Sequence, residues 1–226
     1  MASPFSIRSA AQAGHTTIQD YFEQHPVRKL QLGADQHVLP GWLNTDLMEQ
    51  DTTYPPEMVK LDARKSLPFP DQSFDRVFSE HMIEHINYHD GRNLLRECHR
   101  ILKPGGIIRL ATPDLKVLLD LYQAESRTPI QEKYVRFITD RFLPGIHDYQ
   151  GIFVLNNAFY NWGHRFLYDR HTLTALLREC GFDRFQYPLT LESDVLDLRD
   201  LESHGKLIED EAINRFETMV IEATRN

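Results

Sequence analysis

Cysteine is scarce in this chain, and so are long apolar runs and clusters of positive charge. The 226 residues include two cysteines, which excludes a disulfide framework and a zinc-ribbon pattern. We expect Cys98 and Cys180 to be buried, reduced thiols on the apolar faces of two helices. No stretch approaches the roughly 18 apolar residues of a membrane span, and the N-terminus lacks an apolar signal core. We therefore expect a cytoplasmic protein without membrane insertion.

The charge balance argues against a nucleic-acid partner. Lysine and arginine number 25 against 33 acidic residues, which gives a formal net charge of −8 at pH 7. Proteins that grip phosphate backbones carry basic faces, and no basic run occurs in this sequence. We expect a small-molecule partner and no nucleic acid, and we leave a homodimer open.

The sequence alternates between short strand-like and helix-like segments. Strand signals cover residues 28–33, 42–47, 57–62, 74–79 and 106–113, and two late strands follow at about 182–189 and 216–224. Apolar spacing predicts helices at 17–25, 90–102 and 170–180, the last with Asp169 as N-cap. This alternation predicts an α/β fold with a doubly wound, mostly parallel sheet covered on both faces.

One region interrupts this alternation. Residues 113–169 contain no strand signal, yet they hold eleven of the 24 aromatic residues. We predict a helical, aromatic-rich cap inserted after strand five, within a single domain spanning 16–226. Residues 1–15 are small and polar, and we expect them to be flexible. The insertion fits either a lid over the strand ends or a purely structural subdomain.

Small or acidic residues end the first three predicted strands. Gly33 would let backbone approach a ligand, and Asp46 could accept both hydroxyls of a ribose. Asp62 could accept a hydrogen bond from an adenine amino group. Glycine and aspartate are each common in turns, so no single residue indicates a site. The prediction of a ligand site depends on finding all three at successive strand ends. The dinucleotide pattern G-x-G-x-x-G is absent after strand one, which argues against a nicotinamide cofactor.

Three longer stretches resemble a known family. They are KLQLGADQHVLPGWLNTDL (29–47), LDARKSLPFPDQSFDRVFSEHMIEHI (61–86) and LRECHRILKPGGIIRLATPDL (95–115). They are similar to class I S-adenosylmethionine-dependent methyltransferases, especially the type 11-like bacterial branch with an L-G-C-G-x-x-x-L-P-G-W-x-N-x-D opening. The resemblance covers 28–115 well and 164–182 in outline. It implies a seven-stranded Rossmann-like sheet of order 3-2-1-4-5-7-6, with an antiparallel last strand.

The resemblance also implies S-adenosyl-L-methionine as cofactor and S-adenosyl-L-homocysteine as product. By the family pattern, the cofactor contacts would be Leu32, Gly33 and Ala34 for the methionine part, Asp46 for the ribose, Asp62 and Ala63 for adenine, and Ser79, Glu80 and His81 beneath the sulfonium. Asp35 departs from the pattern, because it replaces the second glycine. It would interfere if that position needs close contact, or it could pair with the cofactor's ammonium group.

The segment HMIEH (81–85) fits H-x-x-E-H, the pattern of an inverted zinc-peptidase motif. Such a site needs both imidazoles on one open face and a third ligand downstream, which the spacing alone does not supply. We predict no metal site and expect Ser79 to cap a helix that contains Glu84 and His85. A metal held by these histidines in some other role stays open.

Methyl transfer is an in-line displacement, so the main task of the protein is alignment, and a general base helps an oxygen or nitrogen acceptor. Histidine suits that role near neutral pH. Our candidates, in order of preference, are His164, His81 and His147. We expect a biosynthetic methyltransferase acting on a sugar, lipid-linked or natural-product acceptor. The alternative, which Asp35 favours, is a degenerate binding or scaffold subunit without turnover.

Overall fold

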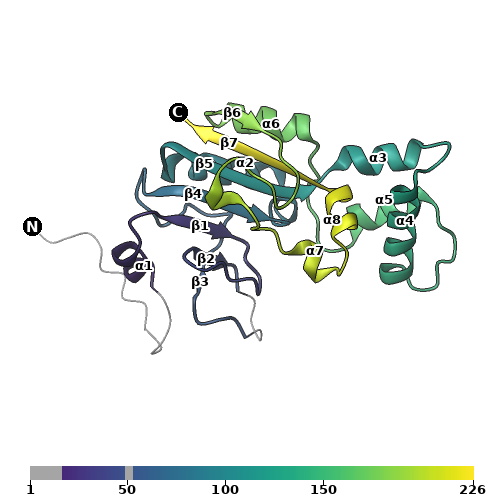
Figure 1. Cartoon of the computed structure of the whole chain (residues 1–226), viewed down its shortest axis with the longest axis horizontal. Coiled ribbons are helices and arrows are strands. Elements are labelled where there is room, and N and C mark those ends of the chain that lie inside the picture. The colour runs from purple at the N-terminus through teal and green to yellow at the C-terminus, as the bar shows by residue number, and fades with distance from the viewer. Residues whose placement is uncertain (1–16, 49–52) are drawn as a thin grey trace, which may run out of the picture.

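The computed structural model describes residues 17–48 and 53–226 (Figure 1). The segment 1–15, predicted to be flexible, lies outside the described residues. The elements in chain order are α1 (Ile18–Gln24), β1 (Lys29–Leu32), β2 (Leu43–Asp46), β3 (Met58–Lys60), β4 (Phe74–Glu80), η1 (Ile83–His85), α2 (Tyr88–Ile101), β5 (Leu102–Pro113), α3 (Leu115–Gln123), α4 (Pro129–Phe142), α5 (Gly151–Tyr160), α6 (Arg170–Glu179), β6 (Phe182–Gln186), η2 (Leu196–Leu198), α7 (His204–Leu207), α8 (Glu211–Glu217) and β7 (Thr218–Arg225).

Seven strands form one sheet in the order β3-β2-β1-β4-β5-β7-β6. β7 is antiparallel to both of its neighbours, and the other pairs are parallel. The predicted fold class, the strand order and the antiparallel last strand are therefore confirmed. Leu32 pairs with Thr45 on one side and with Ser79 on the other. The segments that leave β1, β2 and β4 consequently emerge at one edge of the sheet.

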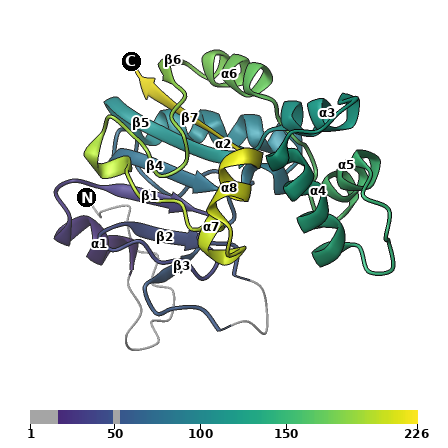
Figure 2. The same ribbon diagram turned by 45° about the vertical axis from the view of Figure 1, so that its right-hand side comes forward.

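Alternate residues of the central strands face two separate cores. Val77 and Ile108 pack with the apolar stripes of α2 and α6 in the main core. Phe78 points the other way and packs with Trp42 and Leu198. That second face is covered by the segment 187–203 with the short η2, whereas α2 and α6 lie behind the sheet (Figure 2). Each large apolar side chain buried in these layers contributes about 1.5–3 kcal/mol to folding.

A helical cap stands beyond the carboxyl end of β5 (Figure 1). The helices α3, α4 and α5 fill the interval between Pro113 and Asp169, and their buried side chains form a cluster of their own. Ile208 and Ile213, from the segment that contains α7 and α8, complete this cluster. The cap is therefore built from two stretches of chain, and the second was not predicted. Among the described residues, no helix is long and apolar enough to span a membrane.

The helix cap predicted at Ser79 was wrong. β4 continues through Ser79 to Glu80, which pairs with Ala111 of β5. Sheet pairing fixes the backbone of Ser79 as extended and leaves no helix for it to cap. η1 follows as a single 3-10 turn, and α2 begins only at Tyr88, where Asn87 Oδ1 accepts from the amide of Asp90. The N-cap predicted at Asp169 is confirmed by its bond from the Thr172 amide.

Candidate functional site

A cavity of about 490 Å³ opens at the carboxyl ends of β1, β2, β3 and β4. Five of the predicted cofactor residues line it: Gly33, Asp46, Asp62, Ala63 and His81. They follow four different strands and meet because the parallel register ends those strands at one level.

Asp46 presents its carboxylate to this cavity while its own chain holds it in place. Oδ2 accepts from the Asp35 amide at 2.9 Å, and Oδ1 accepts from the Met48 amide at 3.3 Å. Each oxygen keeps acceptor capacity for a further donor. Asp35 has φ 47°, in the left-handed region that aspartate tolerates better than most residues. The residue that replaces the family glycine therefore fits the turn, and it lines the cavity itself.

Gly33 cannot carry a side chain. Its φ is 71°, and an added Cβ would lie 2.4 Å from Met82 Cγ. The amides of Gly33 and Ala34 both donate to the Thr45 carbonyl, at 2.9 and 3.0 Å. The loop after β1 is thereby tied to β2, with the Met82 side chain lying over the glycine. Met82 lines the cavity, and no feature of the sequence pointed to this residue.

Asp62 is paired with a residue that sequence reasoning missed. Arg64 Nε donates to Oδ1 at 2.8 Å, and Arg64 Nη2 donates to Oδ2 at 2.9 Å. These hydrogen bonds outweigh partial burial and hold the pKa of Asp62 below its usual value. Arg64 lines the cavity, and half of its side chain is exposed, so it can swing away and release a carboxylate oxygen.

Four predicted cofactor residues do not line the cavity. Leu32, Ala34 and Ser79 are buried side chains, and their predicted contacts stay predictions. Glu80 turns away from the cavity, because its carboxylate accepts from the amides of Ser203 and His204 and from Ser203 Oγ at 2.8 to 3.1 Å. It anchors the chain that enters α7, so the structure does not support Glu80 as pocket floor.

His81 lines the cavity, but protein groups surround both of its ring nitrogens. Nε2 lies 3.0 Å from Thr218 Oγ1, Nδ1 lies 3.4 Å from Glu84 Oε1, and the ring stacks on His204. Burial favours the neutral ring, but the neighbouring carboxylates of Glu84 and Glu217 outweigh it and raise the pKa of His81. This environment suits a residue that positions its neighbours better than a general base.

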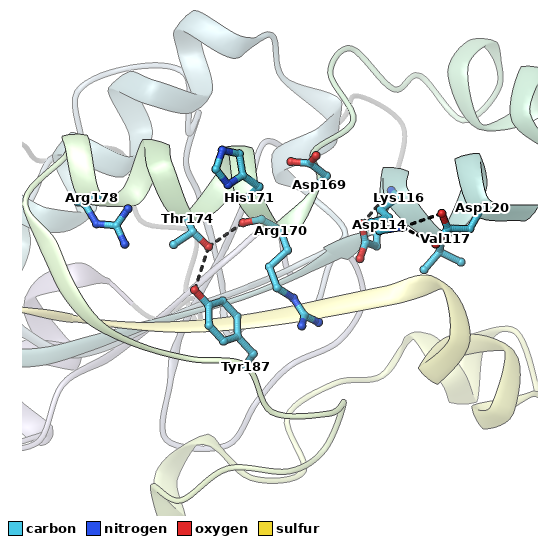
Figure 3. A pocket seen from close by; sticks show the side chains of 10 residues that line it. All are labelled: Asp114, Lys116, Val117, Asp120, Asp169, Arg170, His171, Thr174, Arg178 and Tyr187. Carbon is cyan, nitrogen blue, oxygen red and sulfur yellow. Dashed lines mark hydrogen bonds and ion pairs between the residues drawn. The ribbon is translucent and has the colours of Figure 1, made fainter.

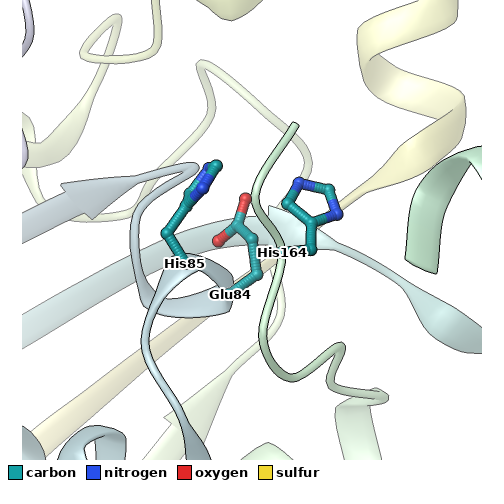
Figure 4. Close-up of side chains that lie close together, drawn as sticks. All are labelled: Glu84, His85 and His164. Carbon is teal, nitrogen blue, oxygen red and sulfur yellow. The ribbon is translucent and has the colours of Figure 1, made fainter. Parts of the chain in front are cut away.

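Glu84, His85 and His164 come together beside the cavity, with one ligand-type atom from each within 4.8 Å of the others (Figure 4). The amides of Arg165 and Phe166 both donate to the Glu84 carbonyl and hold the two segments together, at 2.7 and 3.2 Å. Glu84 is fully buried, whereas His85 is exposed and lines the cavity. The three residues of the zinc-peptidase pattern therefore do not form one cluster. Glu84 and His85 lie beside His164, whereas Nε2 of His81 faces Thr218.

His164 bonds to backbone and not to Asp169. Its Nδ1 lies 2.7 Å from the Ala158 carbonyl, so Nδ1 carries the hydrogen and Nε2 the lone pair. Burial lowers the pKa of His164 despite the nearby Glu84 charge, which keeps the ring neutral at neutral pH. His147 is exposed between α4 and α5 and lines neither this cavity nor the groove described next, so the structure gives no support to a catalytic role for it.

A larger open groove of about 640 Å³ runs between α3 and α6 (Figure 3). Its lining is mostly polar or charged and includes Lys116, Asp120 and Arg170. None of the predicted cofactor or catalytic residues contributes to it, and no end of β1 to β4 reaches it. The smaller cavity is therefore the candidate site, because several strand-end groups among residues 17–48 and 53–226 converge there and none of them reaches the larger groove.

Comparisons with known proteins agree with this geometry. Residues 42–110 match a family model described as a methyltransferase domain. The ubiquinone/menaquinone biosynthesis C-methyltransferase UbiE of Pseudomonas entomophila is 30% identical over 136 residues, which cover 58% of this chain and 46% of that protein. The protein of the same name from Pseudomonas paraeruginosa is 31% identical over 134 residues, covering 57% of this chain and 45% of that protein. This chain thus spans less than half the length of the curated relatives it matches.

One solved structure extends the likeness across the fold. A methyltransferase of Thermotoga maritima, described as a possible histamine N-methyltransferase, aligns with 88% of this chain and 82% of its own. The TM-score is 0.51 and the sequence identity is 17%. At this identity the likeness shows a shared fold.

Proposed function

We propose that this chain is a class I S-adenosylmethionine-dependent methyltransferase that moves a methyl group to an oxygen or nitrogen atom of a small-molecule acceptor. The observation that carries this proposal is the convergence of Gly33, Asp46 and Asp62 on one cavity. Strand-end groups in this order match the methionine, ribose and adenine parts of S-adenosylmethionine.

The donor and acceptor groups of the cavity fit that cofactor. Asp46 keeps acceptor capacity for two ribose hydroxyls, and Asp62 could accept from an adenine amino group once Arg64 moves aside. Gly33 leaves backbone open to the methionine part. Asp35 adds a carboxylate that complements the cofactor's ammonium group.

The cofactor, when bound, supplies a methyl group activated by the positive sulfur. The chain then has to align the acceptor, exclude water and accept a proton. We assign His164 to the acceptor side of the cavity, because its ring packs against His85, which lines the cavity, and because its Nε2 lone pair has no hydrogen-bond partner among the described residues. His81, engaged at both nitrogens, positions the neighbouring groups.

A carbon acceptor is the second candidate. Both Pseudomonas relatives are named C-methyltransferases, at 30% and 31% identity. The cofactor pocket would be the same in either case, because the acceptor atom is selected on the other side of the methyl group. Identification of the methylated atom in the product therefore decides between the two candidates.

Titration with S-adenosylhomocysteine, by calorimetry and thermal shift, tests the cofactor site. We expect binding with one site per chain, and Asp46→Ala should weaken it at least about tenfold because two hydrogen bonds to a charged group are lost. Asp120→Ala, in the larger groove, is the matched control and should bind as the parent does. If the parent shows no stabilisation at millimolar ligand, the chain is a scaffold without turnover.

Turnover is tested with isotope-labelled S-adenosylmethionine and a panel containing a phenol, a sugar, an amine and a hydroquinone. Mass spectrometry and NMR of the product identify the methylated atom. We expect His164→Ala to lower turnover while its affinity for S-adenosylhomocysteine is retained. Equal turnover in His164→Ala would remove this residue from the acceptor site.

A further inference from the structure

The cluster of Glu84, His85 and His164 is more than cofactor binding requires. We propose that these three side chains bind a divalent transition-metal ion of the zinc type at the edge of the cavity. The ligand set is two imidazoles and one carboxylate, which suits zinc and its first-row neighbours. Magnesium and calcium prefer oxygen ligands and fit this set poorly.

The distances allow a shared ion after a small movement. Zinc–ligand bonds of roughly 2.0–2.2 Å place tetrahedral ligand atoms about 3.4 Å apart. The three ligand atoms lie within 4.8 Å of one another, so closure by about an ångström is enough. The His85 side chain is exposed and can supply this rotation, and the Glu84 carboxylate lies between the two rings (Figure 4).

Glu84 carries an independent sign of a missing partner. The residue has no exposed surface, and its Oε2 accepts from Thr112 Oγ1 at 3.0 Å. Its Oε1 is buried and receives no hydrogen bond from the described residues, although His81 Nδ1 lies 3.4 Å away. The contact with His81 Nδ1 is long for a hydrogen bond, so this buried oxygen is only partly compensated, and a directly bound cation would compensate its charge more fully.

One of the proposed ligands, His164, is held in the way that histidine ligands are held in known metal sites. Ligating histidines usually donate their other ring N–H to a carbonyl or carboxylate, and His164 Nδ1 donates to the Ala158 carbonyl. Trp162 and Gly163 both have positive φ, 59° and 75°, in the turn just before His164. A bulky residue such as Trp162 seldom adopts this left-handed backbone conformation, and such conformations often occur at functional sites.

The proposed ion would have an open coordination position that faces the cavity. Three protein ligands leave at least one position for water or substrate. His85 lines the cavity, so that position would be accessible from it. The use of the ion rests on the proposed function, whereas ion binding does not. The ion would hold an acceptor oxygen, the proton of that hydroxyl would pass to water in the open cavity, and His164 would act through the ion.

Calorimetric titration of chelator-treated, untagged protein with zinc chloride, without cofactor or acceptor, tests the site. We expect one tight zinc site per chain, lost or weakened at least about tenfold in His85→Ala, His164→Ala and Glu84→Gln. His89→Ala is the matched control, because His89 is an exposed histidine outside the cluster, and it should bind as the parent does. Magnesium chloride should give no comparable binding.

Cobalt(II) gives a second readout through its visible absorption, which intensifies when imidazole and carboxylate ligands lower its coordination number. His85→Ala should abolish this band, and circular dichroism should show the parent fold because His85 is exposed. Absence of stoichiometric zinc binding, or equal binding in all variants, would overturn the proposal. Binding of S-adenosylhomocysteine by the metal-free protein tests the proposed function separately.

Discussion

Acidic side chains do two different kinds of work in this molecule. One set, here called the cavity set, lines the cavity or lies directly beside it, and the other joins the late segment of the chain to the sheet and the cap. The cavity set is Asp46, Asp62 and Glu84, and the joining set is Glu80, Glu202, Glu217 and Glu222. The difference lies in how far protein donors already use the carboxylate oxygens.

In the joining set, donors of the chain itself occupy the oxygens. Buried Arg109 donates to Glu202 Oε1 at 2.7 Å and to Glu222 Oε1 at 2.5 Å, and the Leu191 amide donates to Glu202 Oε2. Glu217 likewise accepts from Tyr134 Oη at 2.7 Å, which ties the cap to α8. These acids hold the segment 189–217 in place and have little capacity left for a ligand.

In the cavity set, acceptor capacity remains or can be released. Each oxygen of Asp46 accepts from one amide. Asp62 is held by the half-exposed side chain of Arg64. Glu84 Oε1 accepts no hydrogen bond from the described residues. Position and pairing together therefore separate the two sets: the joining acids are paired away from the cavity, whereas Asp46 and Asp62 line it and Glu84 lies beside it. Glu80 illustrates the point: the family resemblance implied a cofactor contact at this last residue of β4, and its hydrogen bonds from Ser203 and His204 show an anchor.

The largest expected effect is that of Arg109→Met. This change leaves the Glu202 and Glu222 carboxylates buried without their cation, which should cost about 3–5 kcal/mol of unfolding free energy. Urea denaturation followed by circular dichroism measures it. Arg136→Met removes an exposed pair with Glu132 and should cost less than about 1 kcal/mol. Similar costs for the two variants would contradict a structural role for the buried cluster.

A matched pair of glutamate variants tests the comparison directly. Glu202→Gln removes a charge that Arg109 uses and should cost about 1.5–3 kcal/mol. Glu84→Gln keeps the bond from Thr112 and should change stability by less than about 1 kcal/mol in metal-free protein. The same urea titration measures both. If Glu84→Gln proves the more damaging, Glu84 belongs with the joining acids.

Asp46→Asn should affect binding more than folding. The amide keeps one acceptor oxygen for the loop but loses the charge that strengthens bonds to hydroxyls, so affinity for S-adenosylhomocysteine should fall about tenfold. Isothermal calorimetry measures this loss, and the unfolding midpoint without ligand provides the control. Unchanged affinity would place the ribose elsewhere.

The smallest effect is expected from Arg64→Ala. Arg64 holds the pKa of Asp62 below its usual value, so its contribution to stability is complete at neutral pH and disappears as the pH falls through that lowered pKa. Removing Arg64 should raise the Asp62 pKa toward its usual value, observable by NMR titration of the carboxyl carbon. An unaltered titration would show that the Arg64 bonds do not persist in solution.

Short-range features were predictable from the sequence. Gly33, Asp46 and Asp62 were selected because each stands at the carboxyl end of a predicted strand, and neighbouring parallel strands end at one edge of the sheet. The Asp169 cap was also predictable, because the amide that it accepts from belongs to Thr172, only three residues further along the chain. The strand order came from the family resemblance and was confirmed by the sheet.

Long-range partners were not predictable. His164 lies beside Glu84 because the amides of Arg165 and Phe166 donate to the Glu84 carbonyl. No local sequence pattern near either residue indicates this contact. The completion of the cap by Ile208 and Ile213, and the turn of Glu80 toward Ser203, are of the same kind.

The sequence by itself determined the strands, the helix cap at Asp169 and which acids stand at strand ends, because backbone preference and local hydrogen bonds act within a few residues. Only the tertiary structure decided which acids were saturated and which stayed available to a ligand. That outcome depends on donors brought from distant parts of the chain, as Arg109 is to Glu202 and Thr112 to Glu84. The side chain chemistry is the same in both sets, and the partners that folding delivers set their roles.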